Sequence, residues 1–430
     1  FTNSTRAMAS QLPPPAAAPS TTTTTTAATT TTNTSNSTSP ASSATTIFSL
    51  TDDDLREIFL RLPDLPALVR AAFTCRPWLH AVRSSAPFRR LFRTLHPAPL
   101  IGLFLEIDNG GVPSFLPLRR SDPVVAAALR RGDFFLTSLP PVSTGWGLVD
   151  CRGGYVLLWD GMPDKPSVAA LNPMTWTVDV LPPVPAKISA GSTLDFAVLG
   201  FHLLCSEESP WSFRVACVCS DRHRVRVAVF SSETWKWAIR PWVDVGGNCS
   251  LKYMAGTLVG GSIFWPYQGE ARMIRIDTAT MDITFVDLPP LVEVAGQNFA
   301  VGETRNGELC IIYELGFFLH VWTRRSVDGT EVWAQHTILS LAAELDRLTH
   351  ASGLNVQLDL KIVQVRSGLV HLSSTCITHA GTLHGWLFSL PLDTIELELL
   401  LEGSFDGDAH LYNMAWPPSL VRDDESIGQE

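Results

Sequence analysis

A strand-turn-strand unit that recurs about every fifty residues constrains the fold of this chain more than any other feature of its sequence. Each copy has an apolar run, a polar turn and a second apolar run that often ends at proline, which is typical of a β-hairpin. The turns carry Thr175, Thr234, Thr280, Thr330 and Thr394, which lie 59, 46, 50 and 64 residues apart. We therefore expect the chain from residue 97 onward to be all-β and built from copies of one unit.

Further apolar runs fall between these units, and we interpret them as additional strand pairs. Two pairs in each period make a four-stranded blade, so about 320 residues give roughly six blades of a kelch-like β-propeller. The ring is expected to close by pairing of residues 100–107 with 409–416. A β-sandwich is the alternative fold, but the number of strands exceeds what one sandwich usually holds.

A helical segment precedes the strands, and its clearest helix starts at Thr51. Leu55, Ile58 and Leu62 follow the i, i+3, i+7 spacing of one helix face. Thr51 and Asp54 fit a capping box, in which each side chain accepts a hydrogen bond from the other residue's backbone amide. A Leu-Pro pair ends this helix, and later prolines can open further ones. The segment up to residue 96 is predicted to form three or four short helices.

The same segment resembles an F-box. It reads Leu-x(4)-Leu-x-x-Ile-x-x-x-Leu-Pro and then Leu-Val-x(5)-Cys-x-x-Trp, with Thr51 where the family usually has proline. The resemblance implies docking on the Skp-family adaptor of a Skp-cullin-F-box ubiquitin ligase and, through the adaptor, on cullin. The adaptor-binding residues that it implies are Leu50, Leu55, Ile58, Leu62, Pro63, Leu68, Val69, Cys75 and Trp78.

The small size of this helical segment is a physical reason to expect a partner. Apolar burial contributes about 25 cal/mol per Å², so three or four short helices are marginally stable by themselves. We expect their apolar ridge to be left uncovered by the chain and to bind a foreign surface. The alternative is an ordinary helical subdomain that packs on its own C-terminal domain.

The C-terminal part resembles the propeller-like associated domain of plant F-box proteins. The residues that carry this resemblance lie in four segments, 171–183, 229–243, 301–313 and 411–419. The two resemblances together cover nearly all of the chain after residue 46. They imply a substrate-recognition subunit, in which the F-box joins the ligase and the propeller holds a target protein for ubiquitination.

Composition sets the domain boundaries. Residues 1–46 are rich in Thr, Ser, Pro and Ala and carry a single charge, so we expect a disordered leader in which Met8 is the natural start. A transit peptide is the alternative, but such leaders are Arg-rich and amphipathic. The F-box is expected over 47–96, the propeller-like domain over 97–420, and a disordered acidic tail over 421–430.

Charge and cysteine usage bound the partners and the compartment. Residues 47–96 carry a net charge of +3 and residues 97–430 a net charge of −14, which argues against nucleic acid. The basic helices suit an acidic adaptor surface, although solvated arginines are the commoner meaning of such a count. The eight cysteines lack framework spacing, and no apolar run reaches 18 residues, so we expect no membrane span and a location in the cytoplasm, the nucleus or both.

No group of residues predicts an active site. Cys376, His379 and His384 match a metal-ligand string only loosely, without a paired Cys-x-x-Cys or an obvious fourth ligand. Cys217 and Cys219 fall on one face of a strand, as core thiols do. Because the sequence has no nucleophile elbow, Walker loop or His-Glu-x-x-His motif, we expect a non-catalytic protein without metal or cofactor.

Tryptophan is plentiful in the propeller-like part. Twelve of the thirteen tryptophans lie beyond the helical segment, and most are expected to pack in the core. Those left exposed could serve as recognition anchors. Two other functions stay open beside the ligase receptor: a propeller lectin or enzyme with an incidental helical leader, and an F-box protein that acts outside any ligase.

Overall fold

The computed structural model describes most of the chain after residue 49. Everything from Leu50 onward belongs to one unit. The predicted leader over 1–46 lies outside the described residues, and so does the predicted acidic tail beyond Val421. The described residues are 50–105, 112–118, 121–142, 145–162, 166–192, 196–221, 223–246, 251, 256–267, 271–290, 299–349, 359–377, 383–403 and 409–421.

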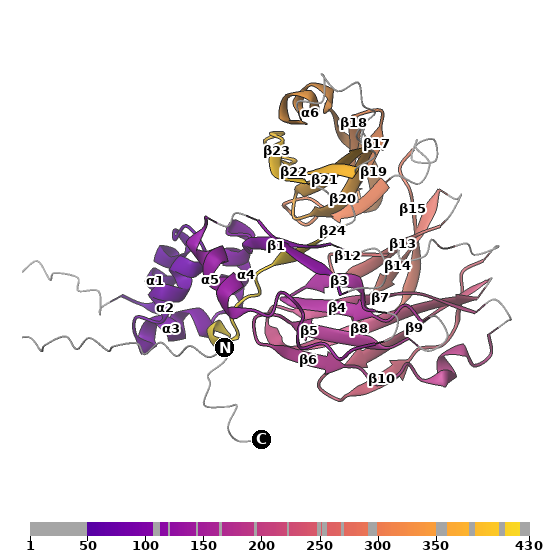
Figure 1. Ribbon diagram of the computed structural model, residues 1–430, viewed down its shortest axis with the longest axis horizontal. Helices are drawn as coiled ribbons and strands as arrows, with labels where there is room; N and C mark the ends of the chain where they lie inside the picture. The colour runs from indigo at the N-terminus through magenta and orange to yellow at the C-terminus, as the bar shows by residue number, and fades with distance from the viewer. Residues whose placement is uncertain are drawn as a thin grey trace, which may run out of the picture. The chain divides into compact units, whose positions relative to one another are not determined.

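Four short helices come first (Figure 1). The predicted capping box is present, because the Thr51 hydroxyl accepts from the Asp54 amide and the Asp54 carboxylate accepts from the Thr51 amide at 2.9 Å. Each of the other three helices has proline in its first turn, where the missing N–H has no helical partner to lose. The helices are α1 Asp52–Leu60, α2 Leu65–Ala72, α3 Arg76–Arg83 and α4 Ala86–Leu95.

Six antiparallel sheets follow as the blades of a β-propeller. In five blades four strands follow in chain order, and β11 pairs additionally with β9. First strands of neighbouring blades lie side by side: β3 beside β7, β12 beside β16 and β16 beside β20. The strands of these blades are β3 Gly147–Arg152, β4 Tyr155–Trp159, β5 Val168–Asn172, β6 Thr177–Val180, β7 Ala197–Ser206, β8 Ser209–Asp221, β9 Arg224–Ser231, β10 Lys236–Ile239, β11 Val243–Asp244, β12 Thr257–Val259, β13 Ser262–Pro266, β14 Arg272–Asp277, β15 Ile283–Asp287, β16 Phe299–Glu303, β17 Leu309–Leu315, β18 Phe318–Val327, β19 Thr330–Ser340, β20 Asp359–Arg366, β21 Leu369–Ile377, β22 Leu383–Pro391 and β23 Glu398–Gly403.

The sixth blade closes the ring. It joins β1 (Leu100–Leu105) and β2 (Ser114–Pro117) to β24 (Ala409–Asn413), and β24 is its inner strand beside β3. β1 pairs antiparallel with β24, as the sequence predicts for the two ends of this domain. This pairing gives β1 and β24, from the two ends of the domain, a partner within one sheet. The six-bladed propeller is therefore confirmed, and the β-sandwich alternative is wrong.

Two further α-helices lie within the propeller. α5 (Pro123–Arg131) follows β2 and packs on the closing blade, and α6 (Ala342–Thr349) follows β19. After α5, the buried Asp133 carboxylate accepts four hydrogen bonds, from the amides and hydroxyls of Thr137 and Ser138. Burial disfavours the charge, but these bonds outweigh it and hold the pKa of Asp133 below its ordinary value.

The repeated turn has a backbone signature that its sequence alone does not show. The residues after four of the five repeated threonines have left-handed backbone angles, with φ of 61° at Trp176, 55° at Trp235, 65° at Met281 and 60° at Ile395. The fifth, Thr330, departs from this pattern because it opens β19 after a tight Asp-Gly turn. The repeat is thus structural in four blades, and the alignment at Thr330 is shifted.

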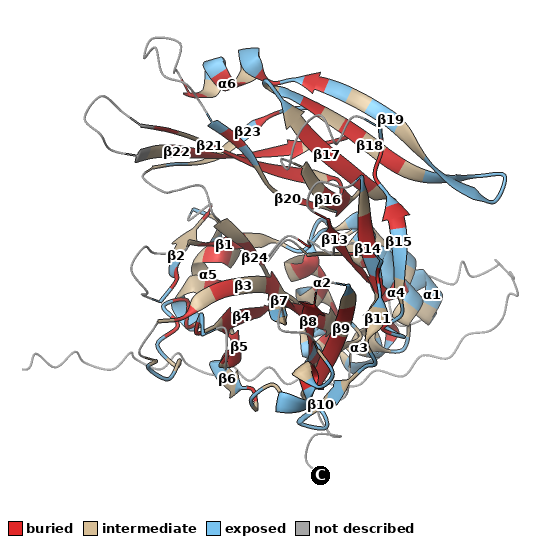
Figure 2. Cartoon of the chain, turned by 90° about the vertical axis from the view of Figure 1, so that its right-hand side faces the viewer, coloured by how far each residue is buried: buried red, intermediate tan, exposed pale blue. Residues whose placement is uncertain are grey.

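Most buried residues lie on the strands of the blades (Figure 2). Of the twelve tryptophans beyond the helices, four are buried, five are half-buried and three are exposed. Some fasten one segment to another: Trp237 Nε1 donates to Pro182 O at 2.8 Å, and Trp333 Nε1 donates to Asp287 O at 2.7 Å. The i, i+2 spacing of Trp235 and Trp237 in the sequence is typical of one strand face, but Trp235 lies in the exposed turn before β10.

Candidate docking surface

The nine residues of the F-box pattern do not form one exposed face. Ile58 is 45% exposed and Pro63 is exposed, whereas Leu55 and Leu68 are buried at 4% and 0%. Leu62 is half-buried. The remaining half-buried members are Leu50, Val69, Cys75 and Trp78. The prediction that all nine can touch a partner is therefore corrected for Leu55 and Leu68, which support the surface from below.

The chain itself covers part of the predicted ridge. Phe59 is buried beneath Trp78, with ring centroids 5.6 Å apart and the planes nearly perpendicular. Trp416 and Leu420, from the C-terminal part of the chain, pack into the same helical core. The ring centroids of Trp416 and Phe92 lie 6.1 Å apart in an edge-on contact. The helices therefore form a core together with the end of the propeller, and the expectation of a wholly uncovered ridge is wrong.

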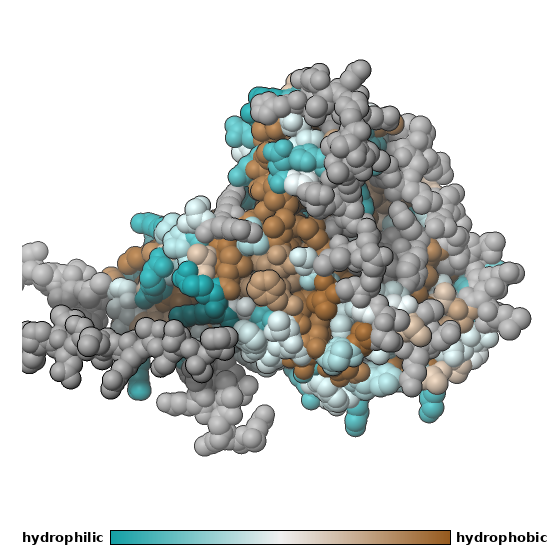
Figure 3. Space-filling model, viewed as in Figure 1, coloured by the Kyte–Doolittle hydropathy of each residue, from teal (hydrophilic) through white to brown (hydrophobic). Residues whose placement is uncertain are grey.

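Apolar side chains nevertheless remain exposed on the helices. Phe73, at the end of α2, is 50% exposed, and the motif did not identify it. On α4, Leu91 and Leu95 are 48% and 45% exposed. Figure 3 shows hydrophobic and hydrophilic residues side by side on the visible face of the helices. Ile58 and Phe73, with the half-buried residues of the motif, define what we call the α1–α2 surface.

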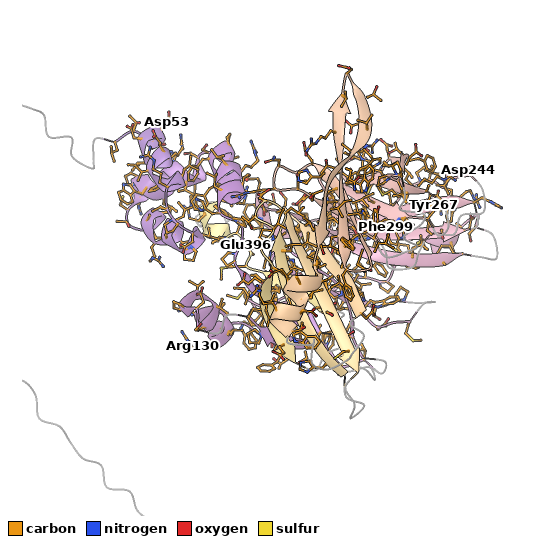
Figure 4. All side chains as sticks on the ribbon, turned by 90° about the horizontal axis from the view of Figure 1, so that it is seen from above. Asp53, Arg130, Asp244, Tyr267, Phe299 and Glu396 are labelled. Atoms are coloured by element: carbon orange, nitrogen blue, oxygen red, sulfur yellow. The ribbon has the colours of Figure 1, made fainter. Side chains whose placement is uncertain are left out.

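Salt bridges fasten α4 to the propeller. Arg89, which is 5% exposed, pairs with Glu208 at 2.5 Å, and Arg93 pairs with Glu207 at 2.8 Å and also with Glu208. Both glutamates lie in the turn between β7 and β8. Part of the basic charge predicted to face an acidic adaptor is thus neutralised inside the protein. On α1, Asp53 and Glu57 stay exposed, and Asp53 projects from the first turn (Figure 4).

The inner strands surround a central channel with a cavity of about 390 Å³. Its lining includes Tyr267 and Phe299, which Figure 4 labels, and the polar Asp150 and Lys361. His202 also lines it, and burial lowers the pKa of His202 to about 4, so this imidazole is neutral near pH 7. Asp150 and His202 come from neighbouring inner strands, β3 and β7, and the negative charge of Asp150 opposes only part of the effect of burial on His202.

The metal-ligand string is not assembled among the residues the structure describes. Cys376 and His384 face each other across β21 and β22, and His384 Nε2 lies 3.1 Å from Glu402 Oε1, but His379 lies outside the described residues. No group of three potential metal ligands is found in the described part of the chain. Cys217 and Cys219 are buried core thiols with sulfurs 3.7 Å apart. No helix in the described ranges is long and apolar enough to cross a membrane.

The fold and the surface together define a class: a closed six-bladed β-propeller that carries a small helical module with exposed apolar side chains. Residues 147–369 match the sequence model of one family, described as "F-box protein AT5G49610-like, beta-propeller". The chain belongs to this family. The match covers β3 to the start of β21 and does not include the four helices. No curated protein matches the chain.

Solved structures with distant similarity were also found. A protein from Lactobacillus plantarum is 11% identical, with 61% of this chain and 85% of that chain covered and a TM-score of 0.36. A hypothetical selenium-binding protein from Sulfolobus tokodaii is 8% identical, with 74% and 94% covered and a TM-score of 0.37. No statement about the function of this chain follows from them.

Proposed function

We propose that this protein is the substrate-recognition subunit of a Skp-cullin-F-box ubiquitin ligase. Its helices over 47–96 would be the F-box that binds the Skp-family adaptor, and its propeller over 97–420 would hold the target protein. The observation that carries the proposal is the F-box pattern on a four-helix module, next to a propeller whose family model is that of F-box proteins. The proposed location is the cytoplasm, the nucleus or both.

The α1–α2 surface supports the adaptor contact. Ile58 and Phe73 are large apolar side chains with about half of their surface exposed. Full burial of such a side chain contributes roughly 1.5 to 3 kcal/mol, so covering the exposed half of each contributes about 1 kcal/mol, and several of them together support a specific contact. Leu55 and Leu68 keep a role in this proposal, because they hold the helices that present the surface.

The attachment of the helices to the propeller supports a role in positioning. Arg89 and Arg93 pair with the turn between β7 and β8, and Trp416 fills the helical core from the propeller side. A target bound to the propeller would therefore be held at a fixed place relative to the adaptor. The chain would carry out no covalent chemistry, and its contribution would be a high effective concentration of target lysines.

Co-purification of the Skp-family adaptor tests the adaptor contact. The variants Ile58→Glu and Phe73→Glu place a charge on the α1–α2 surface and should each weaken adaptor binding about tenfold or more. Leu91→Glu on α4 is the matched control, since Leu91 is 48% exposed against 45% for Ile58. Equal recovery of adaptor with all variants and with the wild type would refute the proposal and favour a propeller lectin or enzyme.

Recruitment of cullin separates the ligase receptor from an F-box protein that acts outside a ligase. The wild-type chain should recover cullin together with the adaptor, and Ile58→Glu should lose both. If the adaptor is recovered but cullin never is, the ligase role is wrong while the F-box assignment stands. Capture of targets by the full chain with Ile58→Glu, which is not joined to the ligase and so does not direct them to degradation, would then identify what the propeller binds.

A further inference from the structure

A second cavity lies at the junction between α4 and the propeller. It has a volume of about 480 Å³, and its lining includes Arg93 of α4 and the last residues of four inner strands. Those residues are Arg152 on β3, Glu303 on β16, Arg366 on β20 and Asn413 on β24. We call it the junction cavity. Its volume is within the range typical of small-molecule sites, about 300 to 1,000 Å³.

Two guanidinium groups in the junction cavity lack the partners that buried charges normally have. Among the residues that the structure describes, Arg152 Nε is buried without a hydrogen-bond partner, and Arg152 Nη2 donates to Leu258 O at 3.4 Å. Burial, with a smaller contribution from the positive charge of Arg152, lowers the pKa of Arg366 to about 10. Within the described part of the chain, neither arginine has a carboxylate at ion-pair distance. Both arginines are half-buried, and a partly desolvated charge without a partner carries a cost that a bound anion would offset.

The carboxylates around the cavity are already engaged. Glu207 pairs with Arg93, and Asp150 accepts from the Leu203 amide at 3.1 Å. Glu303 accepts from the Ser367 hydroxyl at 3.2 Å. All three act on Arg366 only through longer-range attraction, which is smaller than the effect of burial. The lining has an excess of positive charge, since it contains Arg90, Arg93, Arg152, Arg305 and Arg366 against Glu207 and Glu303.

We propose that the junction cavity binds a small organic anion, with Arg152 and Arg366 holding its phosphate or carboxylate group. Guanidinium groups are suited to both anions because their N–H groups match two oxygens at once. Asn413 Oδ1 is buried without a hydrogen-bond partner and would accept a bond from a hydroxyl of the same ligand. The helix on one side and the strand ends on the other favour a small molecule over a protein segment. Such a ligand would touch both the helical module and the propeller.

Thermal unfolding of the full chain tests this site. Sodium pyrophosphate and sodium citrate, compared with sodium chloride at equal ionic strength, distinguish phosphate from carboxylate chemistry. At least one of them should raise the unfolding midpoint by about 2 °C or more. Arg152→Met and Arg366→Met should abolish the shift, and without ligand Arg366→Met should leave the midpoint unchanged or raised. Arg325→Gln, at a half-exposed arginine of β18 outside the cavity, should keep the shift.

A direct binding measurement keeps the proposal testable if an arginine variant does not fold. The phosphorus NMR line of pyrophosphate and the proton lines of citrate should broaden with wild-type protein if that anion binds. The site assignment is overturned if neither anion raises the unfolding midpoint or shows broadened lines with the wild-type protein. It is also overturned if both arginine variants respond to the anions as the wild type does. Because these measurements need no adaptor, their outcome is independent of the proposed ligase function.

Discussion

Trp416 is predicted to hold the helical module together from the far end of the chain. The side chain is 6% exposed, meets Phe92 edge-on at 6.1 Å, and has the Arg93 guanidinium 4.9 Å from its ring centroid. Burying an indole of roughly 250 Å² contributes about 6 kcal/mol. Its Nε1 is buried without a partner, which removes about 2 kcal/mol. Trp416→Ala should therefore cost about 4 kcal/mol, within the range seen for such truncations.

Amide hydrogen exchange of the full chain measures this cost where it arises. A loss of about 4 kcal/mol predicts that protection of α3 and α4 falls about a thousandfold, while the central strands of the blades keep theirs. Trp235→Ala is the control, since Trp235 is 45% exposed and packs edge-on against Phe230 alone among the described rings, so its loss should cost about 1 kcal/mol. If Trp416→Ala lowers protection of α3 and α4 by less than tenfold, the helices do not depend on this contact and the reasoning is refuted.

Three further outcomes are expected from changes elsewhere. Glu208→Gln leaves the buried Arg89 without its charged partner and should lower the free energy of unfolding by about 3 kcal/mol, measured as a lower unfolding midpoint. An unchanged midpoint would contradict a structural role for the pair. Asp133→Asn removes a carboxylate whose pKa is lowered in the folded protein, so it should reduce the free energy of unfolding by about 2 kcal/mol above pH 4. The reduction should shrink as the pH falls below 4, because the wild-type carboxylate is then protonated and loses its advantage; unfolding curves from pH 7 to 3 measure it. Gly302→Ala places a methyl group 2.3 Å from Val365 Cβ, which forces β16 and β20 apart. Urea unfolding should therefore show a free energy of unfolding that is lower by several kcal/mol. A variant as stable as the wild type would mean that the two strands move apart at little cost.

The sequence predicted those parts of the fold that depend on local chemistry. Thr51 and Asp54 form the predicted cap because both partners lie within one turn of helix. The length of the blade repeat could be predicted because each hairpin has a polar turn with threonine. The pairing of β1 with β24 could be predicted because a propeller needs a partner for the strands at the two ends of its sequence. Thr330 was misaligned because a threonine in a turn and a threonine that begins a strand look alike in sequence.

The candidate surface was less predictable, because burial is a property of the whole chain. Helical periodicity places Leu55 on an apolar face but does not say what covers that face. Trp416 reaches it from the opposite end of the sequence, and no local pattern announces the contact. Phe73 was missed because it falls between motif positions, at a helix end. The pairing of Arg89 with Glu208 likewise depends on where a distant turn arrives.

The contact between the two ends has a consequence for biosynthesis. Arg83 Nε donates to Ser419 O at 2.7 Å, across 336 residues of sequence. At about 5 to 20 residues per second, a ribosome needs roughly 20 to 70 s to make the intervening chain. Until then the helices emerge without the tryptophan that completes their core. A nascent polypeptide therefore cannot complete the core of these helices before the propeller has been synthesised, and products that stall before Trp416 would carry an incomplete core.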